Sequence, residues 1–488
     1  MFFVFCVSQP ISENVFINSA TEVNLDKVLN FRVLSCVRVG KTKMKSYRFK
    51  ALLQNSGWLE NAVVSLNDAG KIVSVSQNKM TDADLIDGYA LPAFQNAHSH
   101  AFQYAMAGLA ENHLGDDDFW SWRERMYSLA LNLDPDEMKN IAAMLYAELV
   151  RNGYSNVAEF HYVHHDKTGK PYSNLAAMGE ALIEAAGEAG IKITLIPIFY
   201  QKGGFGQEPN ERQRRFISKT FEDYARLFEA SADICERSEN ANIAVGIHSM
   251  RGVDADDILR VVSDLQEDLP FHIHVSEQLK EVEDCVAFLG KRPVEWLLDN
   301  CDPGERFHFV HATHLTDSET ERLAKSRTNV VLCPSTEGNL GDGIFPLREF
   351  QSFGGNWSLG TDSHIGLNPL EELRLLDYGQ RLISHKRNTF GKDGGLSALT
   401  QAIISGRQAM NNFEPKLFAI GADFDACVIK ADEPLLENVP LENLASTIVY
   451  STDASQIYGT FVRGNLIERD EVYWEIKERF VNCVKRFR

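Results

Sequence analysis

Several features are scarce in this chain of 488 residues, and each scarcity excludes a class of protein. No run of ~18 apolar residues is present, which is the length that a helix needs to span a bilayer. Lys and Arg number 49 against 68 Asp and Glu, and the formal net charge is −19. This balance argues against a nucleic-acid or anionic-membrane partner, because the neutralisation of phosphates requires clustered basic residues.

The cysteines do not follow the spacing of a metal-binding or disulfide motif. There are eight of them, scattered along the chain, and no two make a Cys-x-x-Cys pair. In a chain of this length, such spacing indicates reduced thiols and a cytoplasmic protein rather than a disulfide framework. Internal repeats of about 20–50 residues and low-complexity tracts are absent as well.

The N-terminal segment differs from the rest of the chain. Residues 2–7 are apolar, but no basic residue precedes them and residues 8–13 end the run early. This is a poor match to a secretory signal, which has a basic start and a longer apolar core. We expect residues 1–45 to be a disordered N-terminal extension that activity does not require.

Strand-like and helical stretches alternate through the middle of the chain. The expected strands are residues 90–97, 156–163, 192–200, 243–250, 271–275, 307–311, 330–334 and 357–361. A long helix opens with Asp134, Pro135 and Glu137, which supply an N-cap, a proline at the first helical position and a capping carboxylate. This alternation predicts a parallel sheet. Eight strands favour an α/β fold with a (β/α)8 TIM-like barrel over residues 91–414, with the chemistry at the C-terminal ends of the strands.

Both ends of the barrel segment are flanked by shorter alternating runs. Residues 62–66 and 71–75 enclose Asp68-Ala69-Gly70, which is a hairpin signal. Similar runs occur at residues 426–429, 447–450 and 457–462. We expect residues 46–90 and 415–475 to form one small β-sandwich domain from distant parts of the chain.

Histidines stand where expected strands end, and the first pair is the most informative. His98 and His100 close the first barrel strand. A lone histidine on a strand is more often a hydrogen-bonded core or surface group than a ligand. Side chains two apart on a strand point the same way, so these two imidazoles can hold one ion together.

Other polar residues end later strands. His274 lies in the fifth expected strand with Glu277 just beyond it, His311 ends the sixth, and Asp362 follows the eighth. Strand ends of a barrel meet at one face, so these side chains are expected to converge. Three imidazoles and one carboxylate make a divalent-metal site with room for a water, which points to a metal-dependent hydrolase.

The set His98-x-His100, His274-x-x-Glu277, His311 and Asp362 resembles the amidohydrolase superfamily in its mononuclear deaminase branch. Binuclear branches typically supply a bridging lysine from strand four, whereas residues 245–248 contain none, which favours one metal. Longer strings at residues 98–103, 119–123, 159–165 and 339–346 resemble the formimidoylglutamate deiminase family. The likeness runs from about Tyr47 into the C-terminal region.

The resemblance implies a reaction and a role for each site residue. The reaction is zinc-dependent hydrolytic deimination of N-formimidoyl-L-glutamate to N-formyl-L-glutamate and ammonia, a step of histidine degradation. One divalent ion, Zn2+, would be bound by His98, His100, His274 and Asp362. Asp362 would also take the proton of the water, His311 would orient it, and Glu277 would carry protons to the leaving nitrogen. The substrate would be held by Gln103, Arg123, Tyr162, His248 and Arg251.

The two arginines agree with a small anionic substrate. Arg123 and Arg251 follow the first and fourth expected strands, and an arginine fork binds a carboxylate through two hydrogen bonds. The alternative is that both form salt bridges with Asp and Glu on rim loops. Position alone does not separate these readings, and the family likeness favours binding.

Two other functions stay open. The same metal centre could deaminate a purine-like or related aromatic base, which would leave the arginines without carboxylate partners. The chain could also be a catalytically inactive barrel kept as a binding protein, although such proteins usually lose metal ligands and every ligand position is filled here. The resemblance also allows a homodimer, but no interface is visible in the residues.

Overall fold

The computed structural model describes residues 44–77, 82–111, 119–265 and 267–487. Lys43–Arg488 form one compact unit. The expected N-terminal extension lies, up to residue 43, outside the described residues, so its disorder stays a prediction. The first described strand is β1 (Lys45–Gln54).

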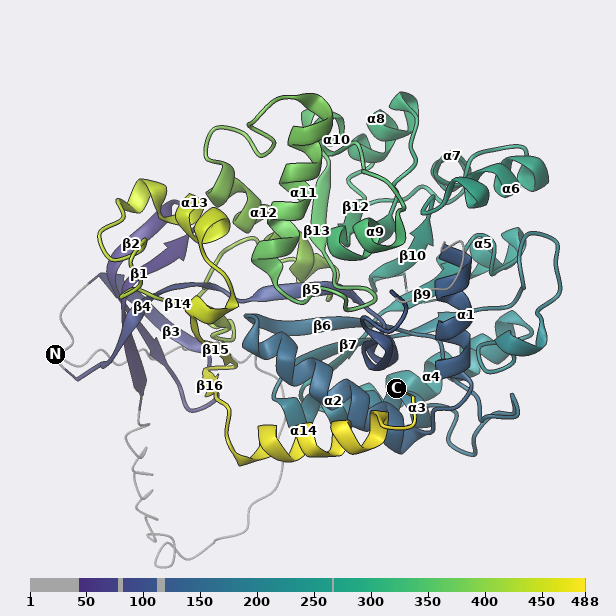
Figure 1. Ribbon diagram of the computed structural model, residues 1–488, viewed down its shortest axis with the longest axis horizontal. Helices are drawn as coiled ribbons and strands as arrows, with labels where there is room; N and C mark the ends of the chain where they lie inside the picture. The colour runs from purple at the N-terminus through teal and green to yellow at the C-terminus, as the bar shows by residue number, and fades with distance from the viewer. Residues whose placement is uncertain (1–43, 78–81, 112–118, 266, 488) are drawn as a thin grey trace, which may run out of the picture. The chain divides into compact units, whose positions relative to one another are not determined.

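Eight parallel strands form the main sheet and run side by side through the middle of Figure 1. In hydrogen-bonding order they are β13 (Asn356–Leu359), β12 (Asn329–Leu332), β11 (Phe307–His311), β10 (Phe271–Val275), β9 (Val245–Ser249), β7 (Lys192–Phe199), β6 (Tyr154–His161) and β5 (Phe94–Ser99). A short strand, β8 (Ala241–Ile243), pairs with β7 beside this path. Parallel strands in sequence order are the pattern of a (β/α)8 barrel.

Backbone hydrogen bonds join the last strand to the first. The carbonyl oxygen of His98 accepts from the backbone N–H groups of Thr361 (3.0 Å) and Asp362 (3.1 Å). The N–H of His100 donates to the carbonyl oxygen of Asp362 at 3.1 Å. These bonds close the barrel at three of the expected metal ligands, and the predicted barrel fold is confirmed.

Helices lie between the strands and cover the outside of the barrel (Figure 1). They are α1 (Phe119–Ala130), α2 (Pro135–Arg151), α3 (Ala177–Ala189), α4 (Phe221–Glu236), α5 (Ala255–Asp264), α6 (Leu279–Leu289), α7 (Pro293–Asn300), α8 (Asp317–Lys325), α9 (Pro334–Leu340), α10 (Leu347–Ser352), α11 (Pro369–Ser384) and α12 (Gly394–Gln408). Short 3-10 turns are η1 (Ala101–Met106), η2 (Glu211–Gln213) and η3 (Ala454–Gln456). The predicted capping box of α2 is present, with Asp134 and Glu137 each accepting from the other's backbone N–H.

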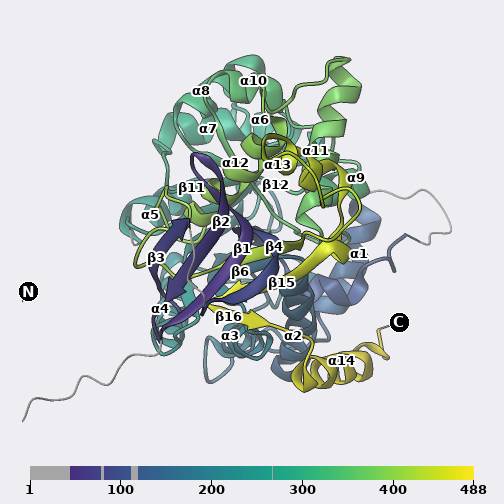
Figure 2. The same cartoon turned by 90° about the vertical axis from the view of Figure 1, so that its left-hand side faces the viewer.

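The two ends of the described chain share a second, mixed sheet, which faces the viewer in Figure 2. Its order is β16 (Asn465–Ile467), β15 (Ile457–Val462), β14 (Ala426–Lys430), β4 (Asp84–Pro92), β1, β2 (Gly57–Leu66) and β3 (Ile72–Gln77). The predicted hairpin joins β2 to β3. Strands from distant parts of the chain thus meet between β4 and β14, as expected. The exact domain boundaries stay predictions.

One segment of this part was predicted wrongly. Residues 447–450 were expected to be extended, but they lie in α13 (Leu441–Ser451). Its buried residues are Leu444, Ala445, Ile448 and Val449, a spacing that places them on one helical face. The three apolar residues 448–450 fit a buried strand or a buried helix face equally well, and here Pro440 starts a helix.

The run at residues 90–97 also divides differently from the prediction. Its first residues belong to β4 in the mixed sheet, and β5 of the barrel begins only at Phe94. Pro92 ends β4, and the N–H of Ala93 donates to the carbonyl oxygen of Asp425 at 3.1 Å. A single apolar run therefore passes from one sheet to the other.

The remaining helix, α14 (Glu471–Val484), packs along α2 on the outside of the barrel (Figure 1). Within the described residues, no helix is both long and apolar enough to cross a membrane. Six described cysteines are free thiols, namely Cys235, Cys285, Cys301, Cys333, Cys427 and Cys483.

The barrel closure predicts a strict size limit at Gly360. A Cβ atom there would lie 2.7 Å from the His98 Cβ and 2.9 Å from the Cys333 Sγ, so β13 and β5 would have to separate. We expect Gly360→Ala to destabilise the fold by about 1–3 kcal/mol, the usual cost of overpacking a core. Thermal melting measures the effect. Gly304→Ala is the control, because its nearest neighbour is the Ser326 oxygen at 4.0 Å, and equal melting temperatures for both variants would contradict the expectation.

Candidate metal centre

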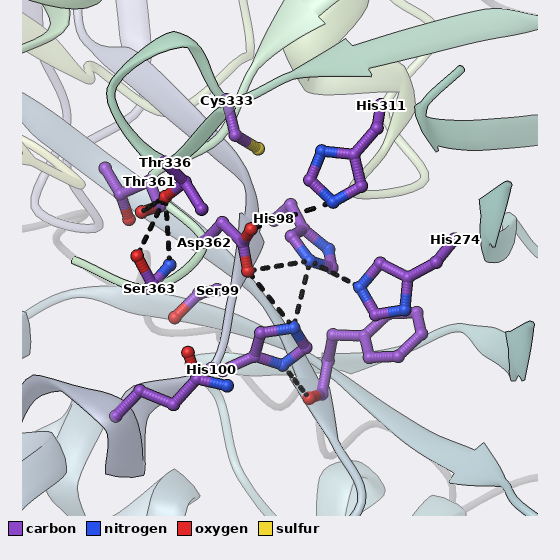
Figure 3. Close-up of polar contacts among 12 residues, drawn as sticks. His98, Ser99, His100, His274, His311, Cys333, Thr336, Thr361, Asp362 and Ser363 are labelled. Carbon is purple, nitrogen blue, oxygen red and sulfur yellow. Dashed lines mark hydrogen bonds and ion pairs between the residues drawn. The ribbon is translucent and has the colours of Figure 1, made fainter. Parts of the chain in front are cut away.

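Four buried side chains from three strand ends converge on one point (Figure 3). The His98 Nε2 atom lies 3.2 Å from the His100 Nε2 and 3.0 Å from the His274 Nε2. The Asp362 Oδ1 atom lies 3.5 Å from the His98 Nε2 and 3.2 Å from the His100 Nε2. Ligand atoms of a tetrahedral zinc ion, at bonds of about 2.0–2.1 Å, are separated by about 3.3 Å. The spacing therefore fits one ion.

Hydrogen bonds on the far side of the rings set their protonation. The His100 Nδ1 lies 2.9 Å from the carbonyl oxygen of Phe160, and the His274 Nδ1 lies 2.9 Å from that of His248. A carbonyl oxygen only accepts, so each Nδ1 carries the proton and donates. The Nε2 lone pairs of His100 and His274 then face each other, His98 and the Asp362 carboxylate. Such a convergence of acceptors fits a cation between them.

The electrostatics agree with this reading. Burial lowers the pKa of His100 to about 3 and holds the pKa of His274 well below its ordinary value, so both rings are neutral at pH 7. Burial acts to raise the pKa of Asp362, but the hydrogen bond and charges from His98, His100 and His311 outweigh it and lower this pKa. Neutral imidazoles and an ionised carboxylate are the forms that bind a metal.

His311 lies on the other side of Asp362 and is surrounded by carboxylates. Its Nε2 is 3.7 Å from the Asp362 Oδ2 and 3.9 Å from the Glu277 Oε1, and its Nδ1 is 3.3 Å from the Glu337 Oε1. Burial acts to lower the pKa of His311, but Glu277, Glu337 and Asp362 together raise it to about 10. The imidazole thus lies between Glu337 and Asp362. It faces the Oδ2 atom of Asp362, whereas the Oδ1 atom faces His98 and His100.

The backbone is strained where two of these side chains leave their strands. His311 has φ +68° and Asp362 has φ +44°, both in the left-handed region that non-glycine residues rarely occupy. Such conformations cost about 1–3 kcal/mol each and persist where the surrounding structure enforces them, often at functional sites.

The structure brings together all the residues that the sequence assigned to the site. One cavity beside the four-atom cluster is lined by His100, Gln103, Arg123, Tyr162, His248, Arg251, His274, Glu277, His311 and Asp362, and also by Trp122, Met126 and Leu340. His98 is fully buried next to this cavity. The predicted convergence at the strand ends is therefore observed, while the role of each residue stays a prediction.

The two arginines stand between this cavity and a larger one. Arg123 and Arg251 also line an outer cavity of about 500 Å³, together with residues of the loop after β7 and of α6. Arg123 donates from Nη2 to the Tyr200 hydroxyl at 3.2 Å, and its guanidinium lies over the Tyr127 ring. A group that reaches the metal cluster from the outer cavity therefore passes two guanidinium groups.

Arg251 also has carboxylate partners within the protein. Its Nη1 donates to the Glu281 Oε2 at 3.1 Å, and its Nη2 lies 3.6 Å from the Glu277 Oε2. Burial raises the pKa of Glu281, and Arg251 opposes that rise. The salt-bridge alternative therefore holds in part for Arg251, because this guanidinium balances buried acids and lines the cavity at once.

Reasoning from the sequence missed several residues beside the site. Trp122 and Leu340 lie within or next to the strings that carried the family likeness, so that signal could have included them. Glu337 and Tyr200 contact His311 and Arg123 without lining the cavity. No local pattern marks them, because each contact joins segments far apart in the chain.

A model of the amidohydrolase family matches residues 89–467 of this chain. The chain belongs to the amidohydrolase family. The match spans the whole barrel and reaches β16 of the mixed sheet. As an amidohydrolase, the chain is a hydrolase that acts on C–N bonds.

Known proteins resemble the chain in sequence and in structure. A formimidoylglutamate deiminase from Pseudomonas aeruginosa is 39% identical over 428 residues, which cover 86% of this chain and 94% of that protein. The crystal structure of an amidohydrolase from Brucella melitensis superposes with a TM-score of 0.86 at 37% identity, covering 91% of this chain and 99% of that one. An adenosine deaminase from Xanthomonas campestris with bound zinc has a TM-score of 0.76 at 19% identity, covering 91% and 98% of the two chains, and shows the shared fold.

The four-atom cluster predicts which substitution removes the metal. His274→Ala deletes one of the three converging Nε2 atoms, so we expect bound divalent metal per chain to fall at least tenfold, together with hydrolysis. Metal content is measured by mass spectrometry after dialysis against zinc. Glu277→Gln is the control, because Glu277 lines the same cavity without belonging to the cluster.

The control variant has an expected outcome of its own. Glu277→Gln should keep its metal but lose about 10²–10⁴-fold in kcat, the usual contribution of a positioned proton carrier. Full metal occupancy in His274→Ala would contradict the centre, and metal loss in Glu277→Gln would move Glu277 into it.

Proposed function

We propose that this amidohydrolase hydrolyses N-formimidoyl-L-glutamate to N-formyl-L-glutamate and ammonia, a step of histidine degradation. The observation that carries this proposal is the 39% identity to the Pseudomonas aeruginosa deiminase, which extends over 94% of that protein. The geometry supports it independently, since a cluster suited to one ion lies beside a cavity lined by two arginines. Water adds across the C=N bond of the formimidoyl group, and the nitrogen leaves as ammonia.

The metal in this proposal is one zinc ion, held by His98, His100, His274 and Asp362. A divalent ion in such a site supplies a nucleophilic water at neutral pH, because it lowers the pKa of the bound water. Two imidazoles are oriented by the carbonyl oxygens of Phe160 and His248, which fixes their Nε2 atoms toward the ion. Zinc bound in the Xanthomonas campestris relative of the same fold is consistent with this choice.

Proton transfer falls to the acids and the imidazole on the cavity side. Asp362 would accept a proton from the attacking water, since it stays ionised among the histidines. His311 would orient that water, because its Nε2 lies 3.7 Å from the Asp362 Oδ2 and its ring is held by Glu337. Glu277 would deliver the proton to the formimidoyl nitrogen, so that ammonia rather than an amide anion leaves.

The glutamate part of the substrate accounts for the cavity's other polar groups. Arg123 and Arg251 would each take one carboxylate, because a guanidinium fork matches its geometry. Gln103 and Tyr162 would add hydrogen bonds, and they already meet each other at 3.0 Å between the Gln103 Nε2 and the Tyr162 hydroxyl. His248 would contact the substrate beside Arg251.

Ammonia release separates this proposal from its rivals. The purified protein, loaded with zinc, is expected to release ammonia from N-formimidoyl-L-glutamate and not from guanine, because a neutral planar base offers no carboxylate to the two guanidinium groups that line the cavity. Release from guanine alone would favour a base deaminase. Bound metal without turnover of either compound would favour an inactive binding protein. A cytoplasmic location, which the free cysteines support, and a homodimer remain parts of the proposal.

Charge removal tests the substrate more finely. Arg123→Met should lower kcat/KM for N-formimidoyl-L-glutamate about 10–150-fold, which corresponds to about 1.5–3 kcal/mol for a charge-assisted hydrogen bond. Arg123→Lys should restore little, since one ammonium group cannot make two parallel bonds. Zinc content should stay unchanged throughout. Steady-state kinetics measure kcat/KM for each variant. An unchanged kcat/KM in Arg123→Met would remove the main physical support for an acidic substrate.

Arg251→Met needs its own control, because Glu281 would be left buried without its partner. We expect this variant to lose stability as well as substrate binding. Arg292→Met offers the comparison: Arg292 pairs with buried Glu319 at 2.7 Å but does not line the cavity. A kcat/KM loss in Arg251→Met that Arg292→Met does not share would assign the difference to the substrate.

A further inference from the structure

Tyr200 follows β7 directly and is almost completely buried, at 2% exposure. Its ring stacks on the His248 imidazole, with centroids 4.2 Å apart and planes at 23°. The ring also lies against Gly252, where an added Cβ would approach it to 3.1 Å. Tyr200 is thus held in one orientation behind a wall of the cavity that it does not itself line.

Two nitrogen donors meet the hydroxyl of Tyr200. The Gln213 Nε2 donates to it at 2.9 Å, and the Arg123 Nη2 donates to it at 3.2 Å. Gln213 is fully buried and is fixed in its turn, since its Oε1 accepts from the Asn210 N–H at 2.9 Å. The phenol therefore connects Arg123 to a rigid part of the loop between β7 and α4.

Arginine has a long side chain that loses much rotamer freedom when it is held in one place. Arg123 comes from α1, whereas the metal ligands come from the strand ends, so no shared element aligns its fork with the cluster. The Tyr200 hydroxyl supplies such an alignment before any ligand arrives. A preorganised fork binds a carboxylate more tightly, because less entropy is lost on binding.

We propose that Tyr200 is a positioning residue for substrate recognition, whose hydroxyl holds Arg123 in the orientation that receives a carboxylate. This inference rests on the proposed function, because it assigns Arg123 a carboxylate of the substrate. It adds a specificity-determining residue that neither touches the substrate nor contacts the metal cluster.

Tyr200→Phe tests the proposal, since it keeps the ring on His248 and removes only the hydroxyl. We expect KM for N-formimidoyl-L-glutamate to rise about three- to tenfold, because the lost hydrogen bond acts on binding only through the orientation of Arg123. The value of kcat should stay within about twofold and zinc content should not change, because the reacting groups are untouched. Isothermal calorimetry with N-formyl-L-glutamate should show the same fold loss in affinity.

The matched control is Tyr224→Phe. Tyr224 is also fully buried and stacks on Phe199 at 4.8 Å, but its hydroxyl donates to backbone carbonyls at 3.0 Å and not to a cavity residue. It should lose stability without a change in KM. An equal KM rise in both variants would overturn the proposal, because any buried hydroxyl would then have the same effect.

A double variant shows whether Tyr200 acts through Arg123. In the Arg123→Met background, Tyr200→Phe should change KM no further, since the group that it positions is gone. An unchanged KM in the single variant, or a full additional rise in the double variant, would overturn the inference while the deiminase function stands. If the wild-type protein neither turns over nor binds these glutamate derivatives, the proposed function fails and this inference fails with it.

Discussion

The closure of the barrel between β13 and β5 is the constraint on which the site depends. The same short backbone segment that accepts hydrogen bonds from Thr361 and Asp362 carries His98 and His100. The proposed ligands from the two ends of the barrel sequence therefore meet only if the sheet closes in this register. Gly360 permits the approach, because any Cβ there would press on His98. Closure of the fold and convergence of the four-atom cluster are consequently one structural requirement.

Charge balance around the cluster follows from burial. The chain carries a net charge of −19, yet the cavity beside the four-atom cluster is lined by two arginines and several imidazoles. Buried carboxylates such as Glu281 and Glu277 lie beside Arg251, and Glu337 and Asp362 lie beside His311. Each of these four acids thus has a basic neighbour, which offsets the high cost of an isolated buried charge. An anionic ligand can bind here despite the acidic surface, since the local field is set by the groups that line the cavity.

Periodicity and strand ends made much of this architecture predictable. Alternating strands and helices indicated a parallel barrel, and parallel strands place their C-terminal ends on one face. That rule alone brings His274, His311 and Asp362 together, and the period of two does the same for His98 and His100. Residues 447–450 were predicted wrongly because three consecutive apolar residues carry no period, so the helical spacing appears only with Leu444 and Ala445 included.

Residues that act by positioning other residues could not be predicted from the sequence. Glu337 meets His311 from a helix after the next strand, and Tyr200 meets Arg123 across several elements. Neither residue sits at a position that a period or a motif singles out, and a buried tyrosine is usually part of the core. Their contacts depend on where loops fold back over the barrel mouth, which local propensity does not determine. A histidine at a strand end can be predicted to face the site, because every barrel of this type shares that geometry. The groups that orient the histidine lie on segments whose conformation is particular to this chain, so the sequence does not reveal them.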